Sequence, residues 1–167
     1  IASRMLGWPA RERYIDAAQA RRAELTDVEQ MLIDLFHTRL RGDMGGQLAV
    51  LRDLVRATGF AEFGRAYAGV LGDSRQLGEA SAVLWSVGPG PGREHIPFWT
   101  SLVNVEHLRG AHARALEAAE LSVREAGLRV AVRWRKLRAL AALGRPAELR
   151  SPIADLASVP PDPFFSI

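Results

Sequence analysis

Apolar residues recur along this chain with the spacing of an α-helix that buries one face. In three segments the apolar positions are separated by steps of three and four residues. These positions are Leu77, Ala80, Leu84 and Val87; Leu116, Ala119, Val123 and Ala126; and Val130, Trp134, Leu137 and Ala141. Alternation of β-branched and polar residues, which is typical of strands, hardly occurs, whereas strong helix formers are frequent. The pattern predicts an all-α protein of about nine amphipathic helices.

Capping residues and glycines mark the expected helix ends. Thr26 is followed three residues later by Glu29, which is the spacing of a capping box at a helix start. Four glycines share a place between two amphipathic segments: Gly42, Gly72, Gly110 and Gly144. Glycine adopts a positive φ without steric cost, so we expect each of them to end a helix. Asp43 and Asp73, which follow two of these turns, are expected to cap the next helix.

The tripeptide Arg41-Gly42-Asp43 matches a known adhesion signal, but we interpret it as one of these turns. Successive glycines of the set are separated by roughly 30–40 residues, a period that indicates a repeat of two helices per unit. The longest interval, which ends at Gly110, contains the sequence Gly-Pro-Gly-Pro-Gly at 88–92. A phosphate-binding loop needs N–H donors and usually a lysine, whereas prolines lack the N–H and no lysine follows. We therefore expect a linker over residues 88–95.

We expect one helical-repeat domain over residues 1–167. Its units are expected at 26–58, 60–88, 96–127 and 129–158. The chain begins with Ile1 rather than methionine, so we also expect it to be a piece of a longer protein. An apolar face left at either end of the repeats can continue into missing units or support self-association.

A two-helix repeat of about 34 residues resembles the tetratricopeptide (TPR) repeat. The third unit carries most of the resemblance: Trp99 is followed by Leu102, and Ala115 stands where the family has the small residue that lets paired helices approach. In the first two units Gln47 and Leu77 occupy that small position. The third unit also departs from the family pattern at three positions, which are Val103 in place of glycine, Glu106 in place of tyrosine and Gly127 in place of proline. The resemblance covers residues 26–150, and the later units are also similar to helical-repeat regions of bacterial regulatory proteins.

This resemblance implies a TPR-like α-solenoid of about four antiparallel helical hairpins. It also implies a non-catalytic scaffold that binds a protein or peptide in a groove lined by the first helix of each unit. Transferring the groove positions to this chain gives six candidate partner-binding residues: Arg39, Glu62, Asn104, His107, Arg135 and Arg138. Among them, Asn104 with Arg135 and Arg138 can hold a carboxylate, because arginine offers a forked pair of donors.

Composition and charge narrow these expectations only slightly. The formal net charge is +3, and Lys136 is the only lysine among 22 basic residues, so the high isoelectric point of about 10.1 reflects arginine. No cysteine is present, which excludes disulfides and thiolate chemistry and fits a cytoplasmic protein. No apolar run reaches the length of a membrane-spanning helix.

The sequence offers no catalytic, cofactor or metal motif. His107 and His112 are five residues apart across the Gly110 turn, whereas a zinc-binding helix places two histidines four residues apart on one face. His95 is close to them in sequence, whereas His37 is alone at an expected helix end. We therefore expect a protein that is not an enzyme and carries no cofactor or metal.

The alternative interpretation is a nucleic-acid-binding or transcription-associated helical domain. Residues 129–138 hold five positive charges, no acid and one tryptophan. On a helical wheel, Arg129, Arg133 and Lys136 cluster on one side, while Arg135 and Arg138 lie roughly opposite. Because a surface that follows phosphates needs its charges on one face, this division favours the scaffold.

Overall fold

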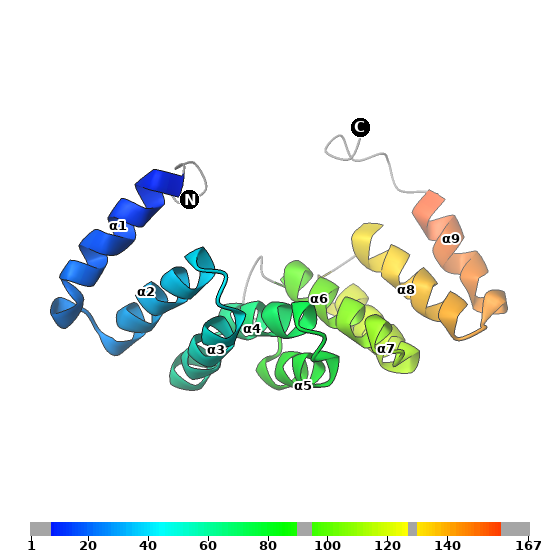
Figure 1. Ribbon diagram of the computed structural model, residues 1–167. Coiled ribbons are helices and arrows are strands. Elements are labelled where there is room, and N and C mark those ends of the chain that lie inside the picture. The colour runs from blue at the N-terminus through cyan, green and yellow to red at the C-terminus, as the bar shows by residue number, and fades with distance from the viewer. Residues whose placement is uncertain (1–7, 90–94, 127–129, 158–167) are drawn as a thin grey trace.

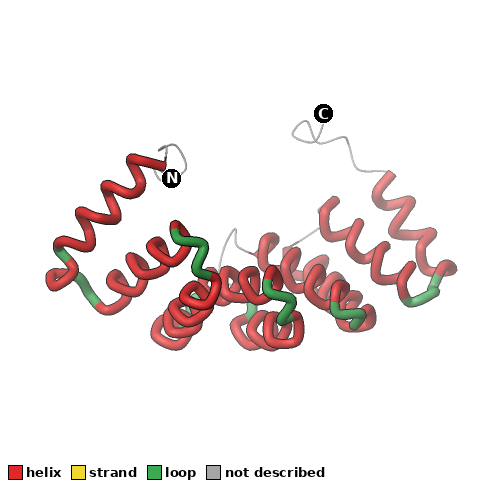
Figure 2. Tube along the Cα trace, viewed as in Figure 1, coloured by secondary structure: helices red, strands yellow, loops and turns green. Residues whose placement is uncertain are grey.

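The computed structural model describes residues 8–89, 95–126 and 130–157, and within these ranges the chain forms helices and turns without a strand (Figure 2). The α-helices are α1 (Trp8–Ala20), α2 (Asp27–Leu40), α3 (Met44–Thr58), α4 (Ala61–Asp73), α5 (Leu77–Val87), α6 (His95–Leu108), α7 (His112–Ala126), α8 (Val130–Ala142) and α9 (Arg150–Ala157). Two short 3-10 helices, Arg22–Glu24 and Pro146–Leu149, precede α2 and α9. The predicted all-α class is confirmed for these residues.

The helices follow one another along an open arc, with α1 near one end and α9 near the other (Figure 1). Each helix from α2 to α8 packs against the next helix in the chain. Helix α6 also contacts α4 and α8, so these three helices form a continuous layer. Helices α3, α5 and α7 lie on the outer side of the arc (Figure 1).

Four turns between consecutive helices share one backbone conformation. Each contains a residue with positive φ, and these are Gly42, Arg75, Gly110 and Gly144. In each turn, the N–H that follows this residue donates to a carbonyl five residues earlier: Asp43 to Thr38, Gln76 to Leu71, Ala111 to Glu106, and Arg145 to Leu140, at 2.8–3.0 Å. This bond satisfies a carbonyl that the end of the helix leaves without an intrahelical partner.

Gly42, Gly110 and Gly144 are turn residues as predicted, but the prediction for Gly72 is wrong. Gly72 lies inside α4, and Arg75 takes the left-handed conformation with a φ of 61°. Asp73 is the last residue of α4 rather than a cap, and Gln76 precedes α5 without a capping side-chain bond. The left-handed positions therefore recur almost evenly, about 34 residues apart, which is more regular than the spacing of the four glycines.

Replacing Arg75 by glycine should raise the free energy of unfolding by about 1 kcal/mol. The reason is that a left-handed backbone brings the Cβ of a non-glycine residue close to the following carbonyl, which costs about 1–2 kcal/mol. Gly110→Ala is the matched opposite change, and it should lower the free energy of unfolding by a similar amount. Urea denaturation of the two variants checks the prediction, and a loss of stability in Arg75→Gly would contradict it.

Two predicted caps are present. The Thr26 side chain accepts from the Glu29 N–H at 3.4 Å, while the Glu29 carboxylate accepts from the Thr26 N–H at 2.8 Å. The Thr26 hydroxyl also donates to the Glu29 carboxylate at 2.7 Å, and this bond, followed by the one from the Thr26 N–H, lowers the pKa of Glu29 by stabilising its charged form. Asp43 caps α3 by accepting from the Gly46 N–H at 2.8 Å.

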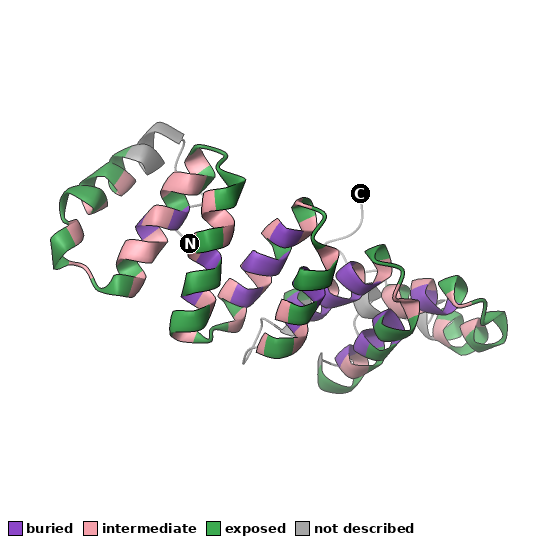
Figure 3. Ribbon diagram, turned by 60° about the horizontal axis from the view of Figure 1, so that its bottom comes forward, coloured by how far each residue is buried: buried purple, intermediate pink, exposed green. Residues whose placement is uncertain are grey.

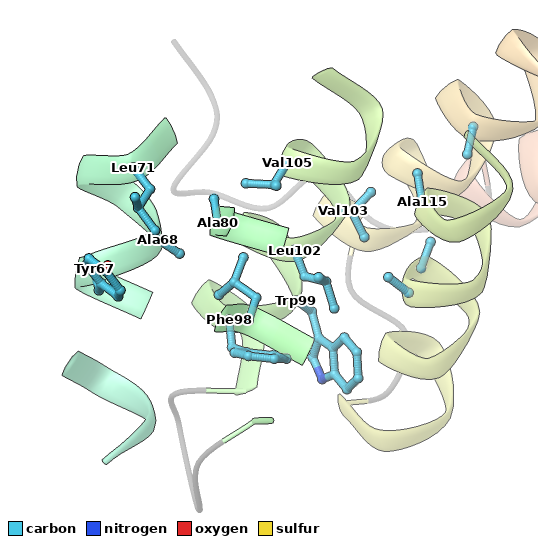
Figure 4. Packing of buried hydrophobic residues seen from close by; sticks show 14 of the residues in the cluster. Tyr67, Ala68, Leu71, Ala80, Phe98, Trp99, Leu102, Val103, Val105 and Ala115 are labelled. Atoms are coloured by element: carbon cyan, nitrogen blue, oxygen red, sulfur yellow. The ribbon is translucent and has the colours of Figure 1, made fainter. Parts of the chain in front are cut away.

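The core runs through the middle of the arc, where α4 to α7 carry most of its buried residues (Figure 3). Leu71, Leu84 and Leu102 are almost completely buried there. Phe98 and Trp99 pack edge to face with ring centroids 5.1 Å apart (Figure 4). The predicted stripes on α5 and α7 contribute buried residues to this core: Ala80 and Leu84, and Leu116 and Ala119.

The predicted stripe on α8 is wrong at two of its positions. Trp134 is 59% exposed and Ala141 is also exposed, whereas Leu137, Ala139 and Leu140 are buried. Because α8 packs against both α6 and α7, the face that contains Leu140 is buried, and the side chain of Trp134 stays exposed to solvent. The side chain of Val130 lies outside the described residues.

Candidate functional site

A groove of about 510 Å³ lies between α4 and α6. The α4 wall contains Gly69, Gly72 and Asp73, and the α6 wall contains Asn104 and Leu108. Arg75 and Leu77 border it at the turn into α5. Carboxylate, guanidinium and amide groups therefore line the groove together with apolar side chains, which is the usual composition of a binding groove.

Gly69 and Gly72 lie in α4 without any packing reason to be glycine. A Cβ built at either position would have no heavy atom within 4 Å. At Gly64, in the same helix, a Cβ would lie 2.7 Å from a methyl of Val87, so close packing requires that glycine. Glycine inside a helix costs about 1 kcal/mol relative to alanine. The two groove glycines therefore leave the backbone of α4 bare at some cost in helix stability.

A group of polar and basic side chains adjoins the groove at Asn104. The Arg135 Nε donates to Asn104 Oδ1 at 3.4 Å, which connects α8 to the α6 wall. Arg138 lies one helical turn further along α8, close enough for its positive charge to lower the pKa of Arg135. Burial contributes more than this repulsion to the lowered pKa of Arg135. We call Asn104, His107, His112, Arg135 and Arg138 the basic cluster.

His107 and His112 face each other across the turn between α6 and α7. Their ring centroids are 4.8 Å apart and the rings are tilted by 50°. Burial, followed by the positive charges of Arg138 and His112, lowers the pKa of His107. The neutral imidazole is therefore favoured at this position.

The structure brings together four of the six predicted partner-binding residues. Asn104 and His107 of α6 lie beside Arg135 and Arg138 of α8. Arg39, in the last turn of α2, and Glu62, in the first turn of α4, are exposed and do not line the groove. The structure therefore does not place these two with the other four.

Glu106 is fully buried, and no functional or structural role was predicted for it from the sequence. Its carboxylate accepts from Ser81 Oγ at 2.5 Å, Trp85 Nε1 at 2.7 Å and Arg109 Nη1 at 3.2 Å. Arg109 also donates to Ser81 Oγ, and the guanidinium of Arg114 stacks over the Trp85 ring at 4.9 Å. The hydrogen bonds connect α5 to α6, and the ring contact of Arg114 connects α7 to α5, so the network positions α6, which carries one wall of the groove and part of the basic cluster.

The position of Glu106 relative to the turn that follows it is the signal that points to its buried role. It lies four residues before the left-handed residue of its turn, where the turns at Arg75 and Gly144 have Leu71 and Leu140 and the turn at Gly42 has Thr38. A carboxylate at a position that two of the other turns fill with leucine indicates a buried polar network, because an unpaired buried charge is too costly to keep. The register could not be read from the sequence, since it depends on Arg75 rather than Gly72.

The basic segment 129–138 does not present its charges on one surface. Lys136 pairs with Glu120 of α7 at 3.0 Å, whereas Arg135 bonds Asn104 of α6. Arg129 lies outside the described residues. The division of charge expected from the helical wheel is thus present for Lys136 and Arg135.

The described part of the chain lacks the side-chain clusters of a metal site and the long apolar helices of a membrane span. It contains no group of three or more histidine, cysteine or acidic residues that could hold a metal ion. None of its helices combines the length and the apolar character that crossing a bilayer requires.

Comparison with protein-family models, with curated proteins and with solved structures finds no match for this chain.

Proposed function

We propose that this chain is a TPR-like α-solenoid of about four antiparallel helical hairpins that acts as a non-catalytic scaffold. The hairpins would be α2–α3, α4–α5, α6–α7 and α8–α9. Support comes from the shared turn conformation and from its even recurrence, about every 34 residues. Counting from Arg75 gives further support. Ala80 is then the fifth residue after the left-handed residue of its turn, which is the small position that Ala115 has after Gly110.

The partner we propose is an extended protein segment that lies across α4, α6 and α8 and carries an acidic group. The observation that carries this proposal is the α4 wall of the groove. There Gly69 and Gly72 leave the helix backbone without side-chain cover, next to Asn104 and the arginines of α8. An apolar side chain of the segment would occupy the space over Gly69 and Gly72. Its acidic group would meet Arg138, whose forked donors suit a carboxylate or phosphate.

Large apolar side chains are exposed at the edge of the groove and on α8. Leu108 is exposed at the edge of the groove, and Trp134 is exposed on α8, next in sequence to Arg135. Large exposed apolar and aromatic side chains are frequent at protein interfaces. A docking role inside a larger cytoplasmic bacterial regulatory protein follows from the sequence resemblance and remains part of the proposal. The nucleic-acid alternative is less favoured, since Lys136 is engaged by Glu120.

Selection from a displayed peptide library tests the proposed function. The chain should enrich peptides with an acidic group near an apolar residue, and the best of them should bind at least about tenfold more weakly to Gly69→Leu, a loss of about 1.4 kcal/mol. Gly78→Leu is the matched control, because Gly78 is exposed on α5 outside the groove and a Cβ there also meets no atom. Failure to enrich any peptide, or equal weakening in the two variants, would contradict the proposal.

A further inference from the structure

The charges around His107 lack an acidic partner. The charged groups that act on it are Arg138 of α8 and His112 of α7, and both are bases. On α6 itself, the neighbouring carboxylate of Glu106 is held by Ser81, Trp85 and Arg109 in the core. Lys136 of α8 is paired with Glu120. In the described part of the chain, therefore, no acid balances the positive charge beside His107.

Polar atoms at this place also lack partners. The Nδ1 atoms of His107 and His112 are buried, and within the described residues neither has a hydrogen-bond partner. Arg138 is half-buried and forms no hydrogen bond or ion pair with any described residue. His112 is the first residue of α7, and Ala111 before it has no side-chain acceptor to cap the helix. Backbone N–H groups at a helix N-terminus favour a negative charge.

We propose that His107, His112 and Arg138 form an oxyanion site that takes up a proton when it is occupied. The site would hold the phosphate, sulfate or carboxylate group of a ligand at the α6–α7 turn. This proposal rests on the proposed function, because the site lies on the same face of α6 and α8. It adds that the binding of an anion at this site strengthens as the pH falls.

The proton linkage follows from the sign of the charges. Without an anion, burial and the charge of Arg138 keep the pKa of His107 below its ordinary value. An oxyanion between the two groups stabilises the imidazolium and raises that pKa again. In the anion-free protein, the unfolded chain binds a proton at His107 more readily than the folded chain does. The contribution of His107 to stability is therefore present above the ordinary histidine pKa and is lost as the pH falls below it.

Sulfate is a suitable probe, because its charge does not change over the pH range in which histidine titrates. Sulfate would be titrated against chloride at constant ionic strength, with the imidazole signals of His107 and His112 followed by NMR. We expect sulfate to raise the pKa of His107. We also expect it to bind about tenfold more tightly near pH 5.5 than near pH 8, which corresponds to one pKa unit.

Variants separate this site from general charge effects. His107→Gln should abolish the pH dependence, and Arg138→Gln should weaken sulfate binding at both pH values. His37→Gln and Arg39→Gln change the same residue types on α2. They should leave the affinity for sulfate and its pH dependence unchanged. Circular dichroism checks that each variant is folded. Equal affinity at both pH values, or an unchanged pH dependence in His107→Gln, would overturn the proposal. Sulfate binding requires no peptide, so the two experiments are independent. The library selection can fail while the sulfate titration confirms this site, and the titration can fail while the selection succeeds.

Discussion

Glu106→Ala is expected to lower the free energy of unfolding by about 3 kcal/mol, because removing one partner of a buried charged network leaves the other groups unpaired. Ser81 and Trp85 would lose their common acceptor, and Arg109 would lose the carboxylate that balances its charge. A cavity would also remain where the side chain is now fully buried. Urea denaturation followed by circular dichroism measures the change.

Glu120→Ala is the matched control for Glu106→Ala. Its carboxylate also pairs with a cation, Lys136 at 3.0 Å, but its side chain is 49% exposed. Exposed ion pairs contribute about 0–1 kcal/mol, so the control should lose much less stability than Glu106→Ala. Similar losses in the two variants would mean that the buried network does not hold α5, α6 and α7 together.

Gly64→Ala is expected to lower the free energy of unfolding by about 1–2 kcal/mol, because overpacking a core typically costs about 1–3 kcal/mol and the helix propensity of alanine returns part of it. The added Cβ would lie 2.7 Å from a methyl of Val87, so α4 and α5 would have to separate. Thermal or urea denaturation measures the loss.

A double variant identifies the cause of that loss. Gly64→Ala combined with Val87→Ala should be more stable than the sum of the two single losses predicts, because the smaller residue at 87 removes the clash. Gly72→Ala is the control in the same helix: its Cβ meets no atom, and the change should raise stability by about 0.5–1 kcal/mol. Additive losses in the double variant would show that the contact with Val87 is not the reason for glycine at 64.

Local sequence signals predicted the parts of the fold that depend on local chemistry. The capping box at Thr26 and Glu29 forms because both partners lie within one helical turn. Gly42, Gly110 and Gly144 end helices because glycine adopts the left-handed conformation at little cost. The same argument failed at Gly72, because a non-glycine residue, Arg75, takes the left-handed position three residues later.

Features that depend on contacts between helices could not be read from the sequence. The periodicity of α8 allows more than one buried face, and packing against α6 and α7 selects the face with Leu137 and Leu140. Asn104 and Arg135 are 31 residues apart in the chain, and their hydrogen bond depends on the packing of α6 against α8. The groove glycines have no sequence signature, since a glycine that packs closely and one that leaves open space look the same.

Chemical-shift mapping with a selected peptide tests the central claim most directly, namely that the face formed by α4, α6 and α8 is the recognition surface. On addition of the peptide, the backbone amides of Gly69, Gly72 and Asn104 should shift, while those of Ala49 on α3 and Ala82 on α5 should stay in place. Shifts confined to the outer helices α3, α5 and α7, with the three groove amides unchanged, would contradict the account.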